Sequence, residues 1–72
     1  MPKYKEGDRV VLVRKILPYL DNPEFDPQPG THGTILYYWD SVYDVEFDGY
    51  EGTYGVYANK LRPEPITPKE EG

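Results

Sequence analysis

The chain has 72 residues and no cysteine, and its 13 acidic residues against 8 basic ones give a net charge of −5. This length fits one small domain, and the lack of cysteine excludes disulfides, thiolate metal sites and a cysteine nucleophile. The negative charge opposes approach to a phosphate backbone and favours neutral or basic partners. Together with the absence of an apolar run near the roughly 20 residues that cross a bilayer, these features predict a cytoplasmic domain.

The first apolar segment, residues 9–16, is predicted to be a strand that starts after a Gly-Asp turn signal. The following segment, residues 17–30, contains four prolines, which exclude both a helix and an interior strand. This long loop is expected to fold back on Val11 and Val13 of the strand. Three apolar loop residues should make these contacts: Tyr19, Leu20 and Phe25.

Two further strands are predicted to form a hairpin. Residues 34–39 should be the first of them, with Ile35, Tyr37 and Trp39 facing inward, and Asp40-Ser41 should supply a two-residue turn. In residues 42–49 apolar and acidic side chains alternate strictly, as in a strand with one face in a core and one in water. The apolar face consists of Tyr43, Val45 and Phe47, and the acidic face of Asp44, Glu46 and Asp48.

The rest of the chain predicts a fourth strand at residues 54–58, a single 3₁₀ turn at residues 59–62 and a short edge strand from Pro63. The fold class is therefore all-β with five strands, in one domain over residues 1–64 followed by a disordered tail over residues 65–72. The expected core is Val10, Leu12, Ile35, Tyr37, Val45, Phe47, Val56 and Leu61.

The order of these elements resembles an SH3-like barrel. The frame of KOW and related small barrels resembles Gly7-Asp8-Arg9-Val10 followed by Gly30-Thr31-His32-Gly33-Thr34-Ile35. The stretch around the 3₁₀ turn of SH3 domains resembles Gly55-Val56-Tyr57-Ala58-Asn59-Lys60-Leu61, with Lys60 in place of an aromatic. The run from Gly7 to Glu64 is also similar to the peripheral stromal subunit of photosystem I and the variable chain of ferredoxin–thioredoxin reductase. The resemblance implies a five-stranded SH3-like barrel with a long first loop.

Catalytic chemistry finds little support in the sequence. His32 is the single histidine and has no second histidine, cysteine or spaced carboxylate set nearby in the chain, so we interpret it as a turn residue. Ser41 lacks the glycines of a nucleophile elbow. We expect no catalytic residue, no metal site, no cofactor and no enzymatic activity.

Two groups of residues are candidates for binding. Eight tyrosines and one tryptophan exceed what so small a core can hide, and exposed aromatics are typical of binding surfaces. In an SH3-like barrel the long first loop, the turn after the second strand and the 3₁₀ turn converge, which would form an aromatic groove for an extended proline-rich ligand. The groove residues would be Tyr19, Trp39, Tyr57 and Asn59. The second candidate is a row of carboxylates that includes Asp44 and Glu46.

We therefore predict a non-enzymatic protein–protein interaction module, monomeric in isolation, that acts as a small accessory or regulatory factor for another protein and not at a membrane. One alternative is a KOW-like nucleic-acid-binding barrel, and another is an acidic DNA-mimic inhibitor that uses the carboxylate row. The nucleic-acid alternative would need a local basic patch made of Lys3, Lys5, Arg9, Arg14 and Lys15.

Overall fold

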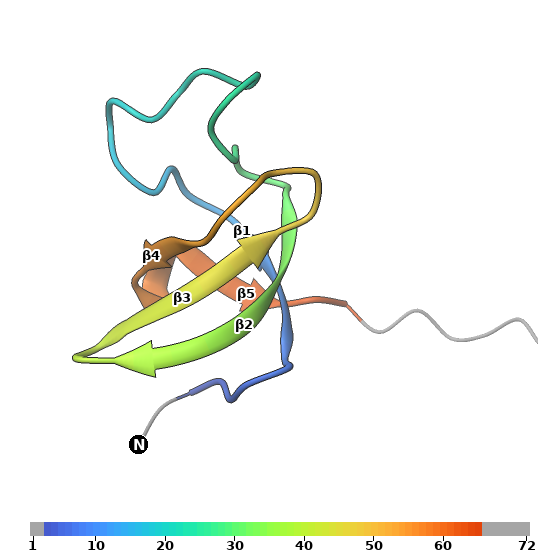
Figure 1. The fold of residues 1–72 in the computed structure, drawn as a ribbon, viewed down its shortest axis with the longest axis vertical. Helices are drawn as coiled ribbons and strands as arrows, with labels where there is room; N and C mark the ends of the chain where they lie inside the picture. Colours follow the sequence, from blue (N-terminus) through green and yellow to red (C-terminus); the bar gives the residue numbers. More distant parts are fainter. Residues whose placement is uncertain (1–2, 66–72) are drawn as a thin grey trace, which may run out of the picture.

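The computed structural model describes residues 3–65, which form five antiparallel strands and one 3₁₀ turn (Figure 1). The elements are β1 (Arg9–Leu12), β2 (His32–Trp39), β3 (Val42–Phe47), β4 (Tyr54–Val56), η1 (Ala58–Lys60) and β5 (Leu61–Pro63). The strand order β4-β3-β2-β1-β5 leaves β4 and β5 at the edges. The predicted all-β class, with a 3₁₀ turn before the last strand, is confirmed. The predicted disordered tail lies, from residue 66 onward, outside the described residues.

Buried side chains from all five strands form a single cluster, so the sheet curls around one core, as in a small β-barrel. The cluster is Tyr4, Val10, Leu12, Ile16, Ile35, Tyr43, Val45, Phe47, Val56 and Leu61. Seven of the eight predicted core residues are in it, and Tyr37 is the exception. Tyr4 and Ile16 belong to the core although they lie outside the strands. Ile16 lies outside because β1 ends at Leu12, four residues earlier than predicted. No helix within residues 3–65 is long and apolar enough to cross a membrane.

The N-terminal segment is tied to the core by the hydroxyl of Tyr43. This oxygen accepts hydrogen bonds from the backbone N–H groups of Lys3, at 2.6 Å, and Tyr4, at 3.0 Å. The two tyrosine rings meet edge to face with centroids 5.4 Å apart, a geometry favoured by their quadrupoles. A buried tyrosine needs a partner for its hydroxyl, and the N-terminal backbone supplies it here.

The turn between β2 and β3 is the predicted two-residue turn. Asp40 and Ser41 both have positive φ, at 54° and 69°, as a type I′ turn requires. Asp tolerates this conformation better than most residues because its short side chain bonds locally. The tight turn brings the ends of both strands, Trp39 and Val42, directly opposite each other.

A bulge in β2 overturns the predicted direction of several side chains. Ile35 is paired with Val45, whereas Tyr37 is paired with Asp44, so Leu36 is an extra residue in β2. An extra residue reverses the alternation of side chains beyond it. Tyr37 and Trp39 therefore point outward, with 54% and 69% of their surface exposed, and the prediction that they face inward was wrong.

Tyr38 takes the inward direction that was predicted for its neighbours. Its ring lies against that of Tyr43, with centroids 4.7 Å apart. Tyr38 is paired with Tyr43 across the strands, so the two rings are close neighbours on one face of the hairpin. The alternation predicted for residues 34–39, with Ile35, Tyr37 and Trp39 inward, would place Tyr38 outward, and this was also wrong. Tyr38 lies on the side of Tyr43, with 38% of its surface exposed.

The two largest aromatic side chains of the long loop do not hold it against the barrel. Tyr19 and Phe25 are 75% and 64% exposed, so the prediction that they pack on the first strand was wrong, while Leu20 does pack against the core. Pro27 is fully buried. The loop is therefore fixed at points other than its two largest rings.

Two tyrosine hydroxyls from the β3–β4 side of the molecule provide further anchors for the loop. The hydroxyl of Tyr50 donates to the carbonyl of Pro23 at 2.9 Å, and that of Tyr54 donates to the carbonyl of Phe25 at 3.1 Å. Both bonds join segments more than 25 residues apart. They explain why a proline-rich segment without secondary structure takes a defined path (Figure 1).

Candidate functional site

The residues that best qualify as a binding surface lie on the solvent side of β2, β3 and β4. We call this surface the outer face, and define it as Tyr37, Trp39, Val42, Asp44, Glu46, Gly55 and Tyr57. The register places Trp39 beside Val42 and places Tyr37 and Gly55 on either side of Asp44. Three strands thus contribute to one continuous surface.

Tyr57 joins this surface although it follows the last residue of β4. Its backbone is extended, with φ −77° and ψ 153°, so the alternation of β4 continues through it. Val56 is buried opposite Tyr43, and Tyr57 therefore points to the outer side, nearest Val42. Its exposure of 59% agrees with this position.

The outer face has large rings at its flanks and shorter side chains at its centre. Tyr37, Trp39 and Tyr57 are each more than half exposed, whereas Val42 and Asp44 between them are half-buried. Gly55 adds no side chain, and a Cβ there would lie 3.0 Å from Cγ1 of Val42. A partner that contacts the central strip would therefore also contact aromatic rings on both sides.

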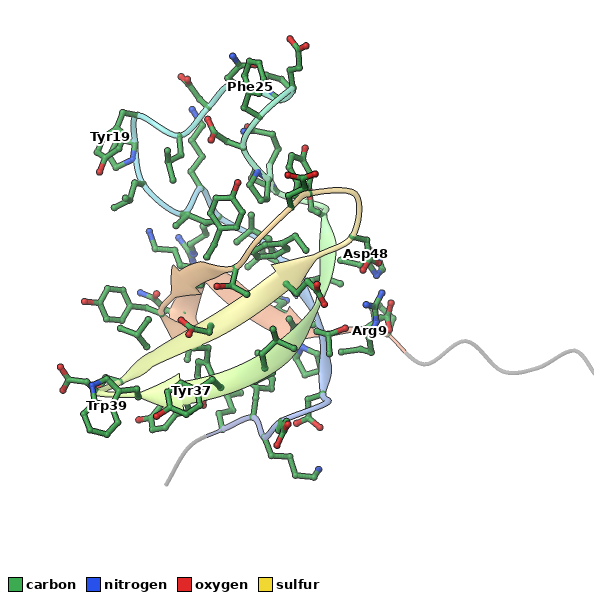
Figure 2. All side chains as sticks on the ribbon, viewed as in Figure 1. Arg9, Tyr19, Phe25, Tyr37, Trp39 and Asp48 are labelled. Carbon is green, nitrogen blue, oxygen red and sulfur yellow. The ribbon has the colours of Figure 1, made fainter. Side chains whose placement is uncertain are left out.

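The structure brings together most, but not all, of the predicted binding residues. Figure 2 shows Tyr37 and Trp39 close together at the tip of the β2–β3 hairpin, with Tyr19 at the opposite end of the molecule near Phe25. The structure therefore does not bring Tyr19 to Trp39. Asn59 is exposed in η1, two residues after Tyr57. Whether these residues bind a partner stays a prediction.

Two carboxylates of the outer face have no counter-ion in the part of the chain that the structure describes. Within residues 3–65, neither Asp44 nor Glu46 takes part in an ion pair. Other carboxylates do: Asp8 with Lys5, Asp48 and Glu64 with Arg9, and Asp21 with Lys15. Asp48, which the alternation placed in the same row, is thus held by Arg9. The charges of Asp44 and Glu46 are therefore not compensated by an ion pair within residues 3–65.

A separate network joins β1, β2 and the residues that follow β3 and β5. Arg9 Nη2 lies 2.6 Å from Asp48 Oδ2, and Arg9 Nε lies 3.2 Å from Glu64 Oε1 (Figure 2 labels Arg9 and Asp48). His32 Nδ1 lies 2.6 Å from Glu64 Oε2. His32 is therefore a strand residue with a carboxylate partner. The sequence could not show this, because the partner is 32 residues away.

The network shifts the titration of its acids. Hydrogen bonds from His32 and Arg9 hold the pKa of Glu64 below its ordinary value, and the hydrogen bond from Arg9 does the same for the pKa of Asp48. The pKa of Arg9 is raised by the same contacts. All of these groups are open to solvent, so their effect on stability is screened.

We expect the free energy of unfolding to fall as the pH is lowered through the acid range. Because the folded pKa values of Asp48 and Glu64 are depressed, their contribution is complete above the unfolded values of about 4 and is lost as the pH falls through the folded values. Urea unfolding between pH 6 and pH 2.5 at low salt measures this. Glu64→Gln should flatten the curve, whereas Glu24→Gln, at an exposed loop position outside the network, should not. An equal slope in both variants would contradict the assignment.

An open hollow borders this network, but its charged groups already have internal partners. It is lined by Lys3, Tyr4, Asp8, Arg9, Pro63, Glu64 and Pro65. Asp8, Arg9 and Glu64 are in ion pairs, and the ammonium of Lys3 lies 5.7 Å from the ring centroid of Tyr4. Among residues 3–65 no three His, Asp or Glu side chains are placed to hold a metal ion.

Comparisons with known proteins add no further constraint. No protein-family model matches the chain, and neither the curated proteins nor the solved structures contain a significant match. The functional inference therefore depends on the geometry and chemistry of the outer face.

Proposed function

We propose that the chain is an SH3-like barrel that acts as a non-enzymatic protein-interaction module, a small accessory or regulatory factor that binds another protein through the outer face. The order of elements, with a long first loop and a 3₁₀ turn before the last strand, supports the SH3-like assignment. The observation that carries the function is the exposure of Tyr37, Trp39 and Tyr57 around carboxylates that have no ion-pair partner among residues 3–65.

The physics of interfaces supports this use of the outer face. Tryptophan and tyrosine dominate the binding energy of interfaces because they bury a large area with few rotatable bonds. Here Tyr37 and Trp39 stand on paired strands, so little backbone freedom is lost there on binding. Exposed apolar patches with polar residues around them mark interaction sites.

The ion pairs favour this proposal over the nucleic-acid alternative. Three of the five residues of the proposed basic patch, Lys5, Arg9 and Lys15, are paired with carboxylates. A phosphate backbone would have to displace these acids and would meet a net charge of −5. The acidic DNA-mimic alternative uses the same outer face, and the experiment below distinguishes it from the proposed function.

Capture from the native host's lysate on immobilised protein, with identification by mass spectrometry, tests the proposal. Trp39→Ala should weaken capture of the partner by about 2 kcal/mol, or about 30-fold in Kd. Tyr19→Ala, an equally exposed aromatic at the other end of the molecule, is the matched control and should leave capture unchanged. Both variants should keep the wild-type circular dichroism spectrum.

The pattern of losses separates the hypotheses. Under the proposal, neutralising Asp44 and Glu46 lowers mainly the association rate and its salt dependence. If Trp39→Ala does not change binding and neutralising Asp44 and Glu46 abolishes it, the acidic DNA-mimic hypothesis replaces binding through the aromatic residues. If Trp39→Ala and Tyr19→Ala have equal effects, the outer face is not the site.

A further inference from the structure

We propose that the occupant of the outer face is an extended, lysine- or arginine-rich segment of the partner, with its basic residues at alternate positions. This inference deepens the proposed function and rests on it. It is drawn from three properties of the outer face: its charge, the position of its carboxylates relative to aromatic rings, and the spacing of those carboxylates.

The charge of the outer face excludes most other occupants. Its defined residues contain two carboxylates and no basic residue. The nearby cation, Arg9, donates to Thr34 opposite Glu46 but is paired with Asp48 and Glu64. Asp44 is half-buried between Tyr37 and Gly55 and has no ion pair within residues 3–65. A neutral apolar occupant would remove this carboxylate from water without a partner, which is costly. An acidic occupant would be repelled.

A basic side chain satisfies both the rings and the carboxylates. The aliphatic stem of lysine or arginine packs on apolar surface while its charged end reaches a polar group. The faces of tryptophan and tyrosine also attract cations directly. Tyr37 lies next to Asp44 in the register, and Trp39 lies next to Val42 on the same strands. A lysine or arginine of the partner whose aliphatic stem packs on either ring can therefore bring its charged end to Asp44.

The spacing of the carboxylates specifies the shape of the segment. Asp44 and Glu46 are two residues apart on β3, which separates them by about 6.6 Å along the strand. An extended segment repeats its same-face side chains at the same distance. A polyproline helix repeats its faces every three residues, or about 9.3 Å, and does not match. The geometry therefore favours a strand-like occupant over the proline-rich ligand expected from the sequence.

Three synthetic peptides of ten residues test this inference on the full chain. The first alternates lysine and threonine, the second replaces each lysine by glutamine, and the third has the composition of the first with all lysines at one end. Titrations followed by nitrogen–proton correlation spectra report both affinity and location. We expect the alternating peptide to bind at least about tenfold more tightly than the glutamine peptide at low salt, and several-fold more tightly than the block peptide.

Variants of the protein confirm the location. The double variant Asp44→Asn, Glu46→Gln should weaken the alternating peptide by about tenfold and reduce its salt dependence. The double variant Glu24→Gln, Glu51→Gln makes a matched change of charge away from the outer face and should change affinity by less than about twofold. Dispersed spectra of each free variant show that it is folded.

Every result either supports or overturns the inference. Equal binding of lysine and glutamine peptides, shifts confined to residues away from the outer face, or no binding of any peptide would overturn it. Equal binding of the alternating and block peptides would overturn the claim that the basic residues alternate, and only the basic character of the segment would remain. If the peptides do not bind as expected but Trp39→Ala still weakens capture of the partner, only this inference is overturned. If Trp39→Ala has no effect on capture, the proposed function is overturned.

Discussion

Replacing Phe47 by alanine is expected to leave most of the chain unfolded at 25 °C. Phe47 ends β3 with 1% of its surface exposed, and its ring meets that of Tyr54 at a centroid distance of 6.0 Å. Truncating a buried phenylalanine costs about 3–5 kcal/mol. A single core in a chain of this length supplies about 3–5 kcal/mol in total, so the loss consumes the whole stability.

The matched control is the other phenylalanine of the chain. Phe25 is 64% exposed, and Phe25→Ala should change the free energy of unfolding by less than about 0.5 kcal/mol. Urea titrations followed by circular dichroism measure both variants. A loss below about 1 kcal/mol for Phe47→Ala would show that β3 does not carry the core.

Gly33→Ala should be the second most damaging change. A Cβ at this buried position would lie 2.8 Å from Cγ1 of Val45, 2.9 Å from the carbonyl oxygen of Glu46 and 2.9 Å from Cδ1 of Phe47. The carbonyl belongs to the backbone of β3, so relief requires β2 and β3 to separate. Such overpacking costs about 1–3 kcal/mol, and the upper end applies here because three atoms are too close.

Gly55→Ala is the natural comparison for this change. Its added Cβ would approach only Cγ1 of Val42, at 3.0 Å, which belongs to a half-buried side chain able to rotate. We expect thermal unfolding to show a much larger fall in midpoint for Gly33→Ala than for Gly55→Ala. Equal losses would mean that β2 and β3 do not approach each other closely at Gly33.

The sequence predicted the elements that depend on local chemistry. The alternation in residues 42–47 is enough to identify β3 and its buried face, since a half-buried strand needs that period. The Asp40-Ser41 turn follows from the two flanking strands, and the prolines of residues 17–30 exclude regular structure there. These features need no knowledge of distant contacts.

The features that the sequence did not predict depend on tertiary contacts. No residue type marks the bulge at Leu36, because it results from the pairing of β2 with β3. The partnership of His32 with Glu64 forms only when β5 lies beside β1. The loop is anchored through hydrogen bonds to the backbone carbonyls of Pro23 and Phe25, so Tyr19 and Phe25 can stay exposed. Because every residue has a backbone carbonyl, the sequence does not reveal these anchors.

The bulge also changes the candidate site. Without it, Trp39 would share the buried side of Ile35, on the opposite side of the sheet from Asp44. With it, aromatic and acidic residues that the sequence presented as rival binding surfaces lie on one face. A single extra residue in β2 therefore turns two alternative hypotheses into one surface with two kinds of contact.

Acrylamide quenching of Trp39 fluorescence tests the central claim most directly, because Trp39 is the single tryptophan of the chain. In the free protein, where its exposure is 69%, quenching should approach that of free tryptophan. The complex is prepared with a form of the captured partner that has no tryptophan fluorescence of its own. In this complex quenching of Trp39 should fall several-fold, since the outer face is then covered. Strong shielding of Trp39 in the free protein, or equal quenching in the free protein and the complex, would contradict the account.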